Sequence, residues 1–137
     1  ETYVSAPGLK RTAFDLMVNE NTPSVLREFT FNQLTSKDIF IAAQSGDKLA
    51  NAAFETTGKI LGEALADLVA ITTPEAIFLF GGLAKSKKLI LDPCRKSMED
   101  NLLSIWKGKV KLLISGLDEE NAAILGSSAL AWKELNK

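Results

Sequence analysis

The spacing of hydrophobic residues predicts helices over most of the N-terminal half of the chain. The first helix begins near Ser5 or Ala6, because a serine caps helices well and Pro7 suits a first helical turn. One face of this helix is apolar, and its stripe consists of Leu9, Ala13, Leu16 and Met17. Residues 25–31 follow a polar loop and fit either a short helical turn or an extended segment; the pattern does not choose between them.

Two more helices are predicted before the first strand. Thr35 and Asp38 have the spacing of a capping box, so a helix begins there, and Gly46 ends it. Asp47 opens the longest helix, which extends to about Thr72. Its apolar stripe recurs at three- and four-residue steps, at Leu49, Ala53, Ile60, Ala64, Leu68 and Ile71. Further apolar residues widen this stripe, so we expect the helix to be largely buried.

Two glycines lie on one face of the long helix, and they predict a close contact. Gly58 and Gly62 are four residues apart, which places them one above the other. Small residues at this spacing let a neighbouring helix or strand approach the helix backbone. A ligand that approaches the same face is the functional alternative, and the packing interpretation is the simpler one.

Two short segments, 77–80 and 110–114, are rich in large apolar residues and predict β-strands. Their residues are apolar on both sides, as in parallel strands that are covered on two faces. A helix is predicted between them, over 88–103. Its inner side consists of Leu89, Ile90, Pro93, Cys94, Met98 and Leu102. Within it, Pro93 predicts a break or a new first turn near residues 91–92.

The last helix begins at Asp118 or Glu119 and contains a run of small residues. This run, Ala123, Gly126, Ser127, Ser128 and Ala129, predicts a helix that lies closely against a sheet. The order of elements is α/β, with two parallel strands joined by a right-handed helical crossover. A sheet of two strands is normally too small for independent stability. We therefore expect missing sheet partners, and hence self-association or a rearrangement of residues 19–34 over the open face.

Composition excludes several classes of function. The chain has 137 residues, which suits a single domain over 1–137, and a net charge of −1, which gives no electrostatic reason to expect nucleic acid or a membrane as partner. It has no histidine and one cysteine, so Ser–His and Cys–His nucleophiles and Cys/His zinc sites are excluded within it. Cys94 lies in an apolar helical pattern and is interpreted as buried packing in a reducing, cytoplasmic compartment.

The segment 77–86, IFLFGGLAKS, carries the candidate site. A buried strand ends in Gly81 and Gly82, and a helical pattern follows. Ligands of open α/β sheets bind at the carboxyl ends of the strands, where glycines let the backbone approach a phosphate. The pattern therefore indicates a nucleotide or phosphate site at Gly81, Gly82 and the adjoining Leu83. A packing turn without a ligand is the alternative.

Three segments resemble the ROK family of repressors, uncharacterised frames and sugar kinases. They are ETYVSAPGLKRTA (1–13), IFLFGGLAKSKKLILDP (77–93) and ENAAILGSSALAW (120–132). Their order matches the family across nearly the whole chain, and the nearest subgroup is the glucokinase-like sugar kinases. The resemblance implies the actin-like ATPase (ribonuclease H-like) fold. It also implies that this chain is most of the C-terminal lobe of a two-lobe protein.

The resemblance also implies which parts of the family's site lie outside this chain. The N-terminal lobe, the aspartate that acts as general base on the sugar hydroxyl, and the zinc-binding cysteines and histidine are all absent from the sequence. We therefore assign no catalytic residue and no metal ligand, and we expect the chain by itself to be inactive. Glu1 matches a glutamate that accepts hydrogen bonds from sugar hydroxyls, and Gly81 and Gly82 match glycines that line the nucleotide.

This chain departs from the family pattern at two positions near the glycines. Phe80 and Lys87 stand where the family often has glycine. The departure at Lys87 leaves two alternatives for Lys85, Lys87 and Lys88, which either meet phosphate or form a solvated helix start.

The resemblance implies an ATP-dependent hexose kinase, a transferase of carbohydrate metabolism, that uses ATP and Mg²⁺. The unpaired apolar strands separately predict a homodimer or another homo-oligomer. The alternative is the sugar-sensing half of a ROK transcriptional repressor. A phosphate-binding glycine turn upstream would indicate a kinase, and a basic helix-turn-helix would indicate a repressor. A free-standing α/β interaction domain is the third possibility.

Overall fold

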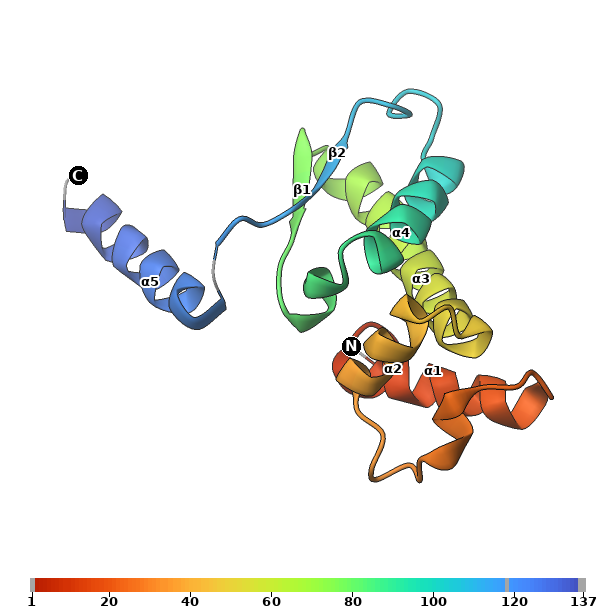
Figure 1. The fold of residues 1–137 in the computed structure, drawn as a ribbon. Helices are drawn as coiled ribbons and strands as arrows, with labels where there is room; N and C mark the ends of the chain where they lie inside the picture. Colours follow the sequence, from red (N-terminus) through yellow and green to blue (C-terminus); the bar gives the residue numbers. More distant parts are fainter. Residues whose placement is uncertain (1, 118, 136–137) are drawn as a thin grey trace.

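The computed structural model describes residues 2–117 and 119–135 of the chain (Figure 1). Helices dominate, and the only sheet among the described residues has two strands. The elements in order are α1 (Ala6–Asn19), the 3₁₀ turn η1 (Val25–Glu28), α2 (Ser36–Gln44), α3 (Lys48–Thr72), β1 (Ala76–Leu79), the 3₁₀ turn η2 (Gly82–Ser86), α4 (Lys88–Asn101), β2 (Lys111–Ile114) and α5 (Glu119–Leu135).

The predicted caps of the N-terminal helices are confirmed. The Ser5 hydroxyl accepts a hydrogen bond of 3.0 Å from the backbone N–H of Gly8 at the start of α1. Thr35 and Asp38 form both bonds of a capping box at the start of α2. The undecided segment 25–31 contains η1, a single turn, so the helical alternative was the better one.

Asp47 holds two segments together. One of its carboxylate oxygens accepts from the backbone N–H of Ala50 at 2.9 Å and so caps α3. The other accepts from the N–H of Val25 at 3.0 Å in η1. Although partial burial opposes ionisation, these hydrogen bonds lower the pKa of Asp47 below its ordinary value. The N-terminal segment is thereby tied to the long helix.

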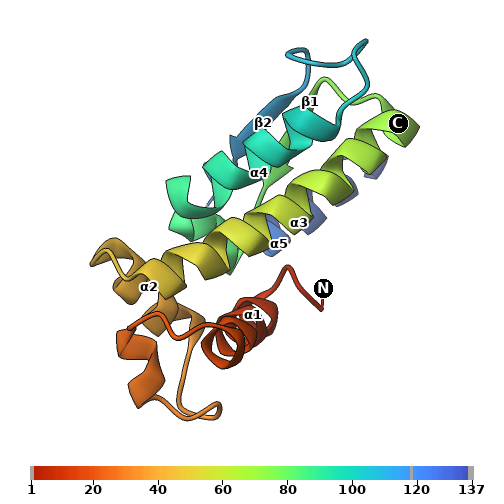
Figure 2. The same ribbon diagram turned by 90° about the vertical axis from the view of Figure 1, so that its right-hand side faces the viewer.

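Helices α3 and α4 pack closely along the face that carries the two glycines (Figure 2). A Cβ atom placed on Gly58 would lie 2.6 Å from the Cγ atom of Pro93. One placed on Gly62 would lie 2.4 Å from the carbonyl oxygen of Cys94. The predicted close approach is confirmed, and the partner is a helix, so the glycines serve packing between helices.

The predicted break at Pro93 is wrong. α4 continues from Lys88 to Asn101 with Pro93 inside it. A proline in this position removes one helical hydrogen bond, and its ring crowds the preceding turn. The Pro93 ring fits in the space left by the missing side chain of Gly58, so packing against α3 offsets part of this cost.

Two groups of buried side chains form the core. The first joins α1, η1, α2 and the N-terminal half of α3, and it includes Leu26 and Leu34 from the segment 19–34. The second joins the C-terminal half of α3 to α4 and the two strands, and it includes Val69, Met98 and Leu112. Because residues 26 and 34 belong to the first group, the proposed rearrangement of 19–34 over the sheet does not occur.

The two strands are parallel and in the predicted places, with Ala76 opposite Lys111 and Leu79 opposite Ile114. Ile77, Leu79 and Leu112 face the second core group. On the other face of the sheet, Phe78 is 64% exposed and Leu113 is 39% exposed. The strands are apolar on both sides, as predicted, but within this chain only one side is covered.

Two further predictions about burial are wrong. α5 lies apart from the sheet in Figure 1, and its side chains from Ile124 to Leu135 are exposed. A Cβ placed on Gly126 would meet nothing within 4 Å. In α3, Leu68 and Ile71 are exposed, because α4 covers the adjacent face that contains Leu65 and Val69. Within the run of small residues in α5, Gly126, Ser128 and Ala129 are therefore exposed and not packed against the sheet.

Candidate functional site

The glycine pair forms a tight turn at the carboxyl end of β1. Gly81 has φ 103° and ψ 178°, a backbone conformation that is essentially restricted to glycine. The Ala84 N–H donates to the carbonyl oxygen of Gly81 at 2.9 Å and closes the first turn of η2. The first glycine is therefore required by the conformation of the chain.

The second glycine has a different role. Gly82 has no positive φ, and a Cβ added to it would meet nothing within 4 Å. Neither conformation nor packing requires glycine there. Because Gly82 has no side chain, open space remains beside its backbone, and a ligand can occupy that space.

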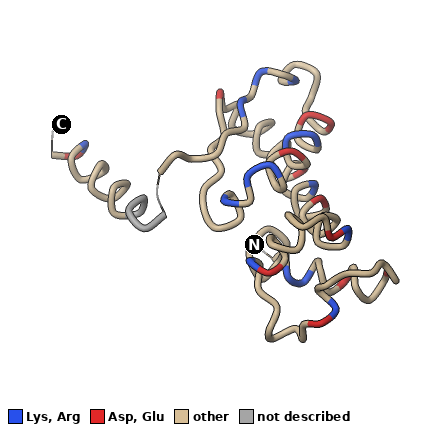
Figure 3. The backbone as a smooth tube through the Cα atoms, in the orientation of Figure 1, with Lys and Arg blue, Asp and Glu red and all other residues tan. Residues whose placement is uncertain are grey.

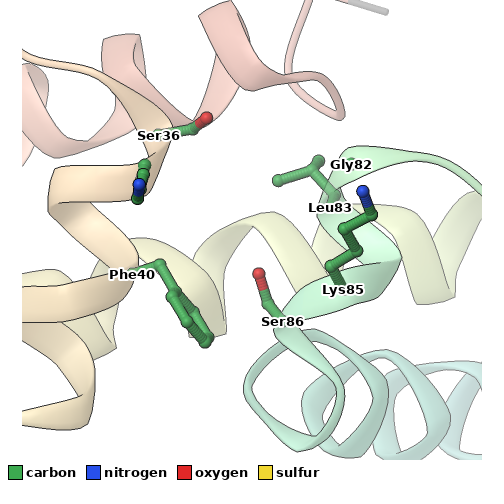
Figure 4. Close-up of a pocket in the computed structure, with 7 residues that line it drawn as sticks. Ser36, Phe40, Gly82, Leu83, Lys85 and Ser86 are labelled. Carbon is green, nitrogen blue, oxygen red and sulfur yellow. The ribbon is translucent and has the colours of Figure 1, made fainter.

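A hollow of about 270 Å³ lies between α2 and η2, and we call it the α2–η2 hollow. It is lined by Ser36, Lys37, Phe40, Gly82, Leu83, Lys85 and Ser86. Figure 4 shows the Phe40 ring and the Ser86 hydroxyl facing this space from the two elements, with Leu83 across from them. The hollow is largely apolar, with hydroxyl and ammonium groups at its edges.

A second hollow of about 200 Å³ lies where the two strands end, and we call it the strand-end hollow. It is lined by Leu79, Phe80, Gly81, Ala84, Lys85, Lys87, Ile114, Ser115 and Leu117. The turn 81–86 therefore separates two hollows, with Gly81 on one side and Gly82 on the other.

The charge around this turn is positive. Lys37 and Lys85 line the first hollow, Lys85 and Lys87 line the second, and no carboxylate lines either. Figure 3 shows basic positions along η2 and the start of α4. A site with ammonium groups, hydroxyl groups and an open glycine backbone suits an anion such as a phosphate group.

Lys87 is strained. It stands between η2 and α4 with φ 47° and ψ −116°, a conformation that residues with a Cβ rarely adopt. The resemblance described in the sequence analysis implies glycine at this position, and this backbone angle gives a physical reason for it.

The structure places the predicted site residues as follows. Gly81, Gly82 and Leu83 lie together on the turn between the two hollows. Glu1, the predicted sugar ligand, lies outside the described residues. Sequence reasoning missed Ser36, Phe40 and Ser86, which no local motif marks, because α2 meets η2 only in the folded chain.

Two other buried groups are unsuited to catalysis. Cys94 is fully buried, and this burial raises the pKa of its thiol to about 11, so the thiol is neutral and inert near pH 7. The Thr57 hydroxyl is buried without a hydrogen-bond partner among the described residues, and it lines neither hollow. Within the described part of the chain, no helix has the length and apolar character needed to cross a membrane.

Comparison with known proteins gives a consistent result. Residues 1–134 match the ROK family. A glucokinase of Halalkalibacterium halodurans is 27% identical over 137 residues, which are 99% of this chain and 41% of that protein. The N-acetylglucosamine repressor of Escherichia coli O157:H7 is 28% identical over 101 residues, which are 74% of this chain and 24% of that protein.

Solved structures agree with the sequence matches. A ROK family glucokinase from Streptomyces griseus, solved in complex with glucose and AMPPNP, superposes with a TM-score of 0.80 at 30% identity, over 95% of this chain and 43% of that one. The crystal structure of a putative sugar kinase from Cytophaga hutchinsonii gives a TM-score of 0.83 at 24% identity, over 96% of this chain and 43% of that one. These neighbours have the actin-like ATPase fold, so the predicted fold class is confirmed. The chain spans between about a third and two fifths of the length of the glucokinases that it matches.

Proposed function

Because this chain belongs to the ROK family, which it matches over residues 1–134, we propose that it is the C-terminal lobe of an ATP-dependent, glucokinase-like sugar kinase. The lobe contributes one wall of the nucleotide site and one ligand to the sugar. The glucokinases among its relatives support this choice, including one that is 27% identical over 99% of this chain.

The geometry that carries the proposal is the turn between the two hollows. Gly81 bends the backbone at the carboxyl end of β1, and Gly82 leaves open space beside it. The phosphates of ATP would lie against this turn, with Lys85 and Lys87 nearby to balance their charge. Leu83 would contact the nucleotide from the α2–η2 hollow.

The phosphates of ATP offer better ligands for Mg²⁺ than the residues that line the two hollows. The ion prefers oxygen ligands, above all carboxylates. The two hollows offer ammonium and hydroxyl groups, and no group of three His, Cys, Asp or Glu side chains gathers anywhere in the described residues. We therefore assign no metal ligand to this lobe, and Mg²⁺ would reach the site on the phosphates of ATP.

The sugar would be bound through Glu1, whose carboxylate can accept hydrogen bonds from hydroxyl groups. Hexoses are the class of substrate that the relatives support. The open apolar face at Phe78 and Leu113 supports a homodimer or another homo-oligomer. The inert, buried thiol of Cys94 is consistent with a cytoplasmic protein.

A sugar-sensing half of a transcriptional repressor is the second candidate. Repressor relatives support it, at 28% identity over 74% of this chain. Both kinds of protein would use the same lobe to bind a sugar, but only the kinase needs the nucleotide. Binding of ATP at the turn therefore distinguishes the two functions.

The test is titration of the ¹⁵N-labelled chain with MgATP, followed by NMR. The kinase proposal expects shifts of the amides of Gly81, Gly82 and Leu83 that saturate at millimolar concentration, because a single wall of the site leaves much of the ligand in water. No shift at these amides up to solubility-limited MgATP would contradict the proposal and favour the repressor. Inorganic sulfate at equal ionic strength controls for general anion binding.

A further inference from the structure

Ser86 is a buried residue whose hydroxyl lines the α2–η2 hollow. Ser86 is 9% exposed, and Figure 4 shows its oxygen directed into the α2–η2 hollow. A serine hydroxyl can both donate and accept a hydrogen bond. A ligand in the hollow that carries a donor or an acceptor can therefore bond to Ser86.

The walls around this hydroxyl suit a flat ring. Phe40 projects from α2 on one side, and Leu83 projects from η2 on the other. Aromatic rings bind bases by stacking, and this interaction tolerates any base because each has a π face. Ser36, at the start of α2, adds a second hydroxyl at the edge of the space.

The size of the hollow limits what it holds. Its volume of about 270 Å³ lies below that of most complete ligand sites. A ring fits this space better than a whole nucleotide does. Gly82 lines the same hollow and leaves open space beside its backbone, so the rest of the nucleotide can pass from the hollow to the turn.

From these features we propose that the α2–η2 hollow binds the base of the nucleotide and does not distinguish adenine from guanine. The inference rests on the proposed function. It adds that the lobe accepts both purine nucleoside triphosphates.

The reason lies in the kind of polar group that meets the base. At corresponding positions adenine carries an amino donor and guanine carries a carbonyl acceptor. A serine hydroxyl rotates and can donate or accept, so Ser36 and Ser86 serve either base. Sites with groups of fixed polarity discriminate by about 10⁴-fold, and this hollow has no carboxylate and no amide side chain in its lining.

The lysines at the edge do not change this expectation. Lys37 and Lys85 only donate, and both purines present acceptors, the N7 atom among them. A pyrimidine has one ring and covers less of Phe40 and Leu83. We therefore expect weaker binding of UTP, although its hydrogen-bonding groups are equally compatible with the two serines.

The experiment is an NMR titration of the ¹⁵N-labelled chain with the magnesium salts of ATP, GTP and UTP. We expect ATP and GTP to shift the amides of Phe40 and Ser86 with dissociation constants within about tenfold of each other, because the hydroxyls serve both bases. UTP is expected to bind about tenfold or more weakly, because its single ring stacks over a smaller area.

Variants connect the effect to the hollow. Ser86→Ala should weaken ATP and GTP by a similar factor of about three to ten. Phe40→Leu should weaken both purines by about tenfold and UTP by a smaller factor, because a pyrimidine covers less of the ring. Phe78→Leu is the matched control, since Phe78 is exposed on the sheet and lines neither hollow. Thermal unfolding of each variant confirms that it is folded.

Each outcome has a distinct meaning. If ATP binds and GTP binds more than about a hundredfold more weakly, the hollow has fixed polarity and this inference is wrong, while the proposed function stands. Shifts at Gly81 and Gly82 without shifts at Phe40 and Ser86 would also overturn this inference and leave the proposed function unaffected. Failure of all three nucleotides to shift any of these amides would overturn both proposals.

Discussion

Gly62 of α3 and Cys94 of α4 are in direct backbone contact. A Cβ atom on Gly62 would lie 2.4 Å from the carbonyl oxygen of Cys94, and 2.7 Å from the backbone nitrogen of Met98. Backbone atoms of a helix move only with the whole helix. The position of α4, and with it the turn that precedes it, therefore depends on the absence of a side chain at Gly62.

The first prediction follows from this contact. Gly62→Ala should lower the free energy of unfolding by about 1–3 kcal/mol through overpacking. Gly126→Ala is the control: it also lies in a helix, meets nothing within 4 Å, and should raise stability by up to about 1 kcal/mol through helix propensity. Urea unfolding measures both. Equal effects of the two substitutions would show that α3 and α4 are not packed as described.

The two glycines of the turn should respond differently to substitution. Gly81→Ala should destabilise the chain by about 1–3 kcal/mol, because Gly81 has φ 103°. Gly82→Ala should leave the melting temperature unchanged, since its Cβ meets nothing within 4 Å. It should weaken MgATP by about tenfold, because the methyl group enters the space proposed for the ligand. Unchanged affinity in Gly82→Ala would place the nucleotide elsewhere.

Lys87→Gly should stabilise the chain. Relief of the backbone at φ 47° and ψ −116° should exceed the entropic cost of glycine and give a net gain of about 1 kcal/mol. Lys87→Gln is the matched control, because it removes the charge and keeps the strain. If Lys87 meets phosphate, both variants should weaken MgATP while only the first gains stability. A loss of stability in Lys87→Gly would show that the lysine side chain, and not the backbone, dominates at this position.

Cys94 should be unreactive in the folded chain. Burial raises the pKa of its thiol from 9.0 to about 11, so the native state favours the neutral form. The contribution of this group to stability is complete below pH 9.0 and is lost as the pH rises toward about 11. We expect no reaction with Ellman's reagent at pH 8 until guanidinium unfolds the chain. Cys94→Ala should reduce the loss of stability at high pH, and rapid native labelling would contradict the burial.

The chain should self-associate through the open face of the sheet. Phe78 is 64% exposed, and no described segment of the chain covers it. Exposed apolar surface of this kind favours association with a second copy, which would cover it. Light scattering at micromolar concentration should give a mass above that of a monomer, and Phe78→Asp should lower it. Val18→Asp, at an exposed position of α1, should not. A clean monomer in the unsubstituted chain would be the contrary result.

Local signals in the sequence predicted most of the elements. Helix caps at Ser5, Thr35 and Asp47 were correct because capping depends on residues within one turn of each other. The predictions of both strands and of close packing at Gly58 and Gly62 were also correct. Apolar runs and closely spaced small residues indicate the local environment of the residues that form them. The family and the fold class followed from the same short segments.

What the sequence did not determine were the contacts between distant elements. Pro93 stays inside α4 because Gly58, on another helix, leaves room for its ring. Phe40 and Ser86 share a hollow only because α2 and η2 meet in space. α5 and the outer face of the sheet carry apolar side chains that are nevertheless exposed. An apolar pattern in the sequence indicates that a surface can be buried, but it does not identify the partner that buries it. By itself the sequence identified the elements, the family and the glycine turn, while tertiary structure decided which side chains surround that turn.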